Sequence, residues 1–160
     1  MSEKIKPASY SKVQQIQLVM PQHSSHSGRL FGGQLMAWID LTAGVVAFRH
    51  CEGHCTTASV DYLSFDRPIY VKDLIVLDGC VTYVGNSSME VRVDTFTEGA
   101  GLIRELANRA YLTFVSIDEN GRPKRAPRLE IQTEAERLEW EDGVKRDELR
   151  RQRRAARGGV

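Results

Sequence analysis

The sequence predicts an α+β fold in which a meander-rich antiparallel sheet wraps around one long helix. Residues 31–50 are apolar on nearly every side, which is typical of a buried core helix. Segments of alternating or β-branched residues flank this helix along the chain and are separated by short turns. Long consecutive strands joined by short turns favour antiparallel pairing, with the single long helix packed on the sheet.

A first strand and a polar loop are expected before the helix. Apolar residues alternate over residues 13–20, which predicts the strand, and Pro21 ends it. Residues 22–29 then form a polar loop that leads into the helix. Gly53 closes the helix region, so the helix has a loop on one side and a glycine stop on the other.

Four further strands are expected after the helix. Residues 56–65 are rich in β-branched and aromatic side chains, and residues 74–84 form a long alternating run. A turn at residues 85–88 leads to residues 89–97, whose strict alternation predicts a strand with one face in water. Residues 103–117 make the last long strand.

Length and composition indicate one compact domain followed by a charged tail. The 160 residues carry a net charge of +1, so no global charge favours nucleic acid or an anionic membrane. We expect an N-terminal segment at 1–9, the domain at 10–130 and a charged, partly helical tail at 131–160. The basic end of the tail is typical of a nucleic-acid arm or of an exposed or frayed helix. The second interpretation is preferred, because no aromatic residue or motif accompanies the basic run.

The chain is expected to be cytoplasmic, because its start is polar and its apolar runs are too short to cross a bilayer. Cys51 and Cys55 lie beside His50 and His54, an arrangement that could suggest a metal site. Their spacing matches no structural zinc pattern well. We interpret them as ordinary side chains at a helix end and a strand start.

Asp40 is the most informative residue, because it interrupts the apolar helix. An ionised carboxylate in such a helix is costly unless it is hydrogen-bonded, so an unpaired one indicates a functional site. The Gly32-Gly33 step lets a ligand approach the helix amides, which favour developing negative charge. The alternatives are a structural carboxylate bonded to backbone amides, and glycines that permit close packing.

Five segments resemble the acyl-CoA thioesterases of the hotdog fold, in particular the bacterial short-chain and the cytosolic brain-type acyl-CoA hydrolases. Together with P-R-L-E-I-Q-T-E-A-E at 127–136, they lie in the family's order within residues 10–140. They are G-R-L-F-G-G-Q-L-M-A-W-I-D at 28–40, T-A-S-V-D at 57–61, S-F-D-R-P-I at 64–69, G-N-S-S-M-E-V at 85–91 and Y-L-T-F-V-S-I-D-E-N-G-R-P at 111–123.

This resemblance implies a hotdog homodimer with the active site at its interface, and dimers that commonly assemble as a hexamer of three dimers. Asp40 would be the catalytic carboxylate, as a general base on water or as a nucleophile. The amides near Gly32 and Gly33 would polarise the thioester carbonyl. The implied reaction converts acyl-CoA and water to a free acid and coenzyme A. No metal or cofactor is expected, because coenzyme A is part of the substrate, and no nucleic-acid or membrane partner is expected.

The loop before Gly28 departs from the family pattern. The family usually carries an Asn three residues ahead of that glycine, which helps hold water and substrate, whereas this chain has Ser25. A serine can still donate and accept a hydrogen bond. Either Ser25 substitutes, a neighbouring His takes over, or the activity is weakened. We expect retained activity with Ser25 in the site.

Four further residues are expected to contact the substrate. Ser87 and Ser88 lie in a matched segment that in the family borders the coenzyme A channel or holds turns. Arg67 could donate to the nucleotide phosphates, and the packing of Phe31 would influence tunnel depth. Turn positions, packing and solvated surface charge are the alternatives.

A rival hypothesis is a non-catalytic acyl-CoA-binding or regulatory module, which Ser25 and, slightly, the basic tail favour. A dehydratase is disfavoured, because no histidine lies on the helix near Asp40. Coenzyme A release measured with a panel of acyl chains separates hydrolysis from binding.

Overall fold

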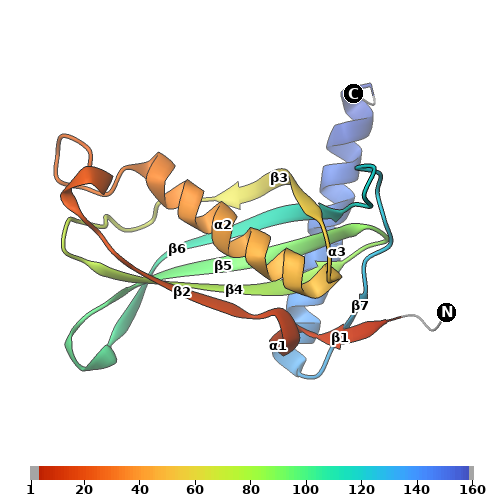
Figure 1. Ribbon diagram of the computed structural model, residues 1–160, viewed down its shortest axis with the longest axis horizontal. Coiled ribbons are helices and arrows are strands. Elements are labelled where there is room, and N and C mark those ends of the chain that lie inside the picture. Colours follow the sequence, from red (N-terminus) through yellow and green to blue (C-terminus); the bar gives the residue numbers. More distant parts are fainter. Residues whose placement is uncertain (1–3, 159–160) are drawn as a thin grey trace.

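The computed structural model describes residues 4–158 and forms one antiparallel sheet with a long helix on each face. Figure 1 shows the first helix lying across one face of the sheet and the second helix crossing behind it. The strand order is β2-β4-β5-β6-β3, so that β2 and β3 are the edges. The elements are β2 (Val13–Leu18), α2 (Gly32–Cys51), β3 (Cys55–Leu63), β4 (Leu74–Val84), β5 (Ser88–Glu98), β6 (Arg104–Ser116) and α3 (Glu134–Ala156).

Smaller elements tie the start of the chain to the end of α2. The short strands β1 (Ile5–Pro7) and β7 (Arg128–Glu130) pair in parallel, and α1 (Ala8–Ser11) follows β1; the remaining turns are η1 (Pro21–His23) and η2 (Ala100–Leu102). The Lys6 ammonium donates to the carbonyl oxygen of His50 over 2.8 Å and lies 2.8 Å from a Glu52 carboxylate oxygen.

The predicted helix and strands are confirmed to within a few residues. The strand expected at 74–84 coincides with β4. The helix begins at Gly32, and its last residue, Cys51, lies two residues before the expected glycine stop. Glu52 adopts the left-handed conformation with φ of 52°, and this residue ends the helix.

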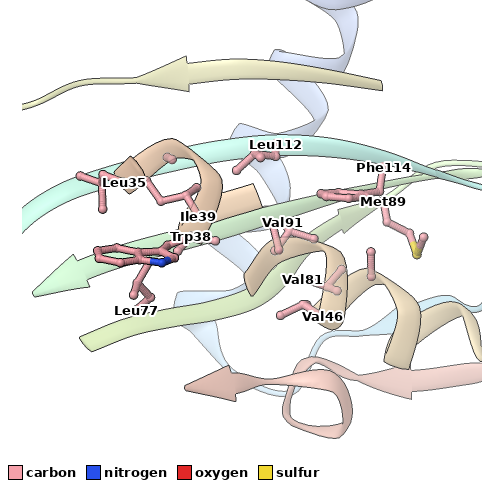
Figure 2. Close-up of a cluster of buried hydrophobic side chains, with 14 of the residues drawn as sticks. Leu35, Trp38, Ile39, Val46, Leu77, Val81, Met89, Val91, Leu112 and Phe114 are labelled. Atoms are coloured by element: carbon pink, nitrogen blue, oxygen red, sulfur yellow. The ribbon is translucent and has the colours of Figure 1, made fainter. Parts of the chain in front are cut away.

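The core lies between α2 and the sheet. Leu35, Trp38, Ile39 and Val46 recur at helical spacing and place one side of α2 against the strands. Figure 2 shows these side chains meeting a layer of strand residues. Burying each large side chain contributes about 2 kcal/mol, so this contact fixes α2 on the sheet. The labelled strand residues are Leu77, Val81, Met89, Val91, Leu112 and Phe114.

The outer face of the sheet is covered, so the prediction that residues 89–97 present one face to water is wrong. Glu90 is 1% exposed, because α3 packs over it. Arg146 of α3 binds the Glu90 carboxylate through two nitrogens at 2.8 and 2.9 Å. Strict alternation of apolar and polar residues occurs equally when the polar face meets a charged helix.

The basic helix expected to be exposed or frayed is therefore packed along one side. Thr133 and Glu136 form a capping box that starts α3. Gly143 brings the helix close to β4, since a Cβ there would lie 2.6 Å from the Cβ of Tyr83. Arg150 reaches the Asp61 carboxylate at 2.7 Å. Two of the basic residues thus neutralise carboxylates on the sheet.

Candidate active site

Asp40 lies on the free flank of α2, opposite the edge strand β3. The Thr57 hydroxyl, on β3, donates a hydrogen bond to Oδ1 of Asp40 over 2.9 Å. Within residues 4–158, this is the hydrogen bond that the Asp40 carboxylate makes, so water or substrate can reach the other oxygen, Oδ2. Thr57 was not predicted as a site residue, although it begins one of the segments that resemble the family.

A trough between α2 and β3 contains this pair at its middle. It comprises a groove of about 360 Å³ toward the helix start and one of about 430 Å³ toward the helix end. Asp40 and Thr57 line both grooves. The first is otherwise apolar, with Gly33, Met36, Ala37, Ile39, Val60, Leu63 and Leu112. The second adds Leu41, Gly44, Val45, Phe48, His54, Cys55, Thr56 and Phe114.

The flank of α2 that carries Asp40 is exposed, which corrects the prediction of a helix buried on all sides. Leu41 is 57% exposed and Phe48 is 53% exposed, and the aspartate beside them is exposed as well. An apolar helix face that nothing in its own chain covers indicates an interaction surface. The sequence pattern alone cannot separate a core face from such a surface.

The start of α2 presents two free amides. Phe31 is the N-cap, and its side chain makes no capping hydrogen bond. The first amides of a helix have no acceptor within the helix, and no oxygen of residues 4–158 accepts from Gly32 or Gly33. A Cβ at Gly33 would lie 2.5 Å from the Phe31 ring. The glycine therefore admits the aromatic ring beside a helix end suited to developing negative charge.

Ser25 does not meet Asp40 within one chain. Its hydroxyl lies 3.1 Å from the Ser27 hydroxyl oxygen and donates to the Arg29 carbonyl oxygen over 3.3 Å. The residue is exposed and lines neither groove of the trough. Within the single chain, Ser25 therefore shapes the loop.

The other expected binding residues lie away from Asp40. Arg67 pairs with Glu105 over 2.8 Å and lines a separate pocket of about 270 Å³ that also contains Gly32. Ser87 and Ser88 lie at the turn into β5. Their carbonyl oxygens accept from the amides of Ser116, over 2.8 Å, and of Gly85, over 2.9 Å.

No group of three histidine, cysteine or acidic side chains within residues 4–158 is placed to hold a metal ion.

His50 is fully buried, with Nδ1 3.3 Å from the Ser11 hydroxyl and Nε2 3.1 Å from the Pro127 carbonyl oxygen. Burial lowers the pKa of this imidazole. Across the described part of the chain, no helix is both long and apolar enough for a membrane span.

Known proteins of one family resemble this chain. Residues 27–103 match the profile of the Thioesterase superfamily. The chain is 41% identical over 145 residues to YkhA, an uncharacterized acyl-CoA thioester hydrolase of Bacillus subtilis, covering 90% of this chain and 84% of that protein. It is 36% identical over 139 residues to the human cytosolic acyl coenzyme A thioester hydrolase, covering 84% of this chain but only 36% of that protein.

Solved structures of acyl-CoA hydrolases have the same fold as this chain. An acyl-CoA hydrolase from Staphylococcus aureus, in complex with butyryl coenzyme A, coenzyme A and coenzyme A disulfide, superimposes with a TM-score of 0.90 at 35% identity, covering 95% of this chain and 93% of that one. The apo form of a hexameric acyl-CoA thioesterase gives a TM-score of 0.90 at 37% identity, covering 95% and 98%. The chain belongs to the hotdog-fold acyl-CoA thioesterases, and the predicted family and fold class are confirmed.

Proposed function

We propose that this protein hydrolyses acyl-CoA thioesters, with Asp40 as the catalytic carboxylate. The observation that carries the proposal is the trough, where the hydroxyl of Thr57 holds one oxygen of Asp40 between an apolar groove and a groove of mixed lining. Ordered in this way, the carboxylate can take a proton from water or attack the thioester carbon directly. Either step produces an oxyanion and then releases coenzyme A and a free acid.

The oxyanion would be stabilised by the amides of Gly32 and Gly33. Removing one such donor typically costs about 3 kcal/mol of transition-state stabilisation. Asp40 follows Gly33 by seven residues, a rise of about 10 Å along the helix, whereas a hydrogen bond spans only about 3 Å. The separation favours a site shared by two chains, in which the amides of one chain face the carboxylate of the other.

A homodimer is therefore part of the proposal. A second copy packed on the exposed flank of α2 would cover Leu41 and Phe48 and exclude water from the carboxylate. It would also allow Ser25 of one chain to approach Asp40 of the other. Assembly of three dimers into a hexamer is proposed further, with support from a hexameric structural neighbour at 37% identity.

The substrate contacts stay proposals as well. We propose that Arg67 binds the phosphates of coenzyme A and that Phe31 lies beside the thioester. Ser87 and Ser88 would line the coenzyme A channel. The reaction needs no metal or cofactor in this scheme, and the cytoplasm is the proposed location. We also count α3 with the domain, because its ion pairs to the sheet, such as Arg150 with Asp61, fix it there.

Coenzyme A release from a panel of acyl-CoA esters tests the function. Turnover that saturates with substrate supports hydrolysis, whereas binding without release supports the acyl-CoA-binding module. Ser25→Ala should lower turnover and Ser25→Asn should preserve it if Ser25 completes the site. If the two variants turn over substrate at the same rate, Ser25 takes no part in the site. The assignment of Asp40 is unaffected by that result.

A further inference from the structure

Two cysteines flank the turn that joins α2 to β3, and the proposed reaction uses neither. Cys51 is the last residue of α2, and Cys55 is the first residue of β3. The Cys51 thiol is 9% exposed, and the Cys55 thiol is partly exposed at the end of the trough. Both are free thiols.

The Cys51 sulfur lies beside the backbone that leads into Cys55. Cys51 Sγ lies 3.7 Å from the carbonyl oxygen of Phe48, and Cys55 Sγ lies 4.0 Å from that of Gly44, one helical turn earlier. Cys51 Sγ also points into the turn, 3.2 Å from the carbonyl oxygen of Gly53. It also lies 3.8 Å from the carbonyl oxygen of His54, the residue that precedes Cys55. A disulfide needs its sulfurs about 2.05 Å apart, so the two side chains must rotate toward each other across the turn to close the bond.

The two thiols differ in acidity. The Cys55 S–H donates to the Cys51 sulfur, which lowers the pKa of Cys51, while the same contact raises the pKa of Cys55. Burial acts in the opposite direction on the pKa of Cys51 but does not outweigh this contact. Cys80, on β4, lacks a thiol partner, and its burial raises its pKa. Of the three cysteines, only Cys51 therefore has a lowered pKa, which favours its thiolate form.

We propose that Cys51 and Cys55 form a redox-modification site that a peroxide converts to an intramolecular disulfide. One sulfur attacks the O–O bond of hydrogen peroxide and becomes a sulfenic acid, with release of water. The neighbouring thiol then attacks that sulfur, and a second water leaves as the S–S bond forms. Two electrons pass from the thiols to the peroxide, and either order of attack gives the same product.

The disulfide has a consequence for hydrolysis, which rests on the proposed function. Cys55 lines the same groove as Asp40 and lies two residues before Thr57 in β3. Closing the bond turns the Cys55 sulfur from the groove toward the helix end and shifts the start of β3. Displacing the Thr57 donor from Asp40 slows hydrolysis by about tenfold, and a thiol reductant restores the rate.

Peptide masses test the site without any use of activity. Trypsin cleaves after Arg49 and Lys72 but resists the Arg67–Pro68 bond, so residues 50–72 carry both thiols on one peptide, and residues 73–92 carry Cys80. After hydrogen peroxide and alkylation, we expect the 50–72 peptide to lose two hydrogen atoms, about 2 Da, and to regain them with dithiothreitol. The 73–92 peptide should remain a reduced, alkylated thiol.

The folded protein should form this bond faster than the protein in urea. A rate no greater in the folded state, or independent alkylation of both thiols with no disulfide, overturns the proposal. Cys51→Ser should abolish the disulfide, and Cys80→Ser, the matched control, should preserve it. If the bond forms and hydrolysis is unchanged, the link to the trough is refuted while the modification site stands. If the reduced protein hydrolyses no acyl-CoA, the proposed function fails and the mass test is unaffected.

Discussion

Replacing Thr57 with valine should slow hydrolysis about tenfold without loosening the fold. Valine keeps the β-branched shape that suits β3 but removes the hydroxyl that donates to Asp40 over 2.9 Å. A hydrogen bond to a charged group contributes about 1.5–3 kcal/mol, and the lower value applies where solvent reaches the pair. About 1.4 kcal/mol corresponds to a factor of about ten in rate.

The assay is steady-state release of coenzyme A from butyryl coenzyme A, with Thr57→Ser as the matched control. Serine retains the donor, so its turnover should stay close to the parental rate, while thermal unfolding of both variants should be similar. Parental turnover in Thr57→Val would refute the idea that this hydroxyl orients the carboxylate. Equal damage in Thr57→Ser would assign the effect to side-chain volume instead.

Three further changes test other parts of the account. Gly44→Ala should stabilise the helix by up to about 1 kcal/mol in thermal unfolding, because a Cβ there meets its nearest aromatic atom at an ordinary 3.6 Å. The same methyl group enters the trough beside Asp40, so turnover should fall. Arg146→Met leaves Glu90, which is 1% exposed, without its cation and should cost about 3 kcal/mol in urea unfolding; an unchanged unfolding midpoint would show the pair to be unimportant. Burial lowers the pKa of His50 in the folded protein below its ordinary value of 6.5. The free energy of unfolding should therefore be highest above pH 6.5 and should fall as the pH drops from there through the pKa of the folded state. Unfolding measured across that range should depend less on pH in His50→Gln.

The helix that carries Asp40 could be singled out from the sequence, because a charged residue is unusual in an apolar helix. An aspartate in an apolar segment behind two glycines points to an active site before any contact is known. Thr57 could not be found in the same way, because only the pairing of β3 beside α2 brings its hydroxyl to the carboxylate. Periodicity cannot supply a contact between elements.

Burial was harder to predict than the elements themselves. Leu41 and Phe48 look like core residues in sequence, but within one chain they face outward, because hydrophobicity does not specify which surface covers it. Glu90 looks like a surface residue, yet it is buried under Arg146, since a polar face can meet a charged helix as well as water. Ser25 and Arg67 stay predictions, because their proposed roles depend on a second chain or on bound substrate.

The most direct test of the account is hydrolysis of butyryl coenzyme A by Asp40→Asn. The amide keeps the size of the side chain and can still pair with Thr57, but it can neither take a proton from water nor attack the thioester. We predict a fall in turnover of roughly 10²- to 10⁴-fold with an unchanged unfolding transition. Turnover at the parental rate would contradict the assignment of Asp40 as the catalytic carboxylate.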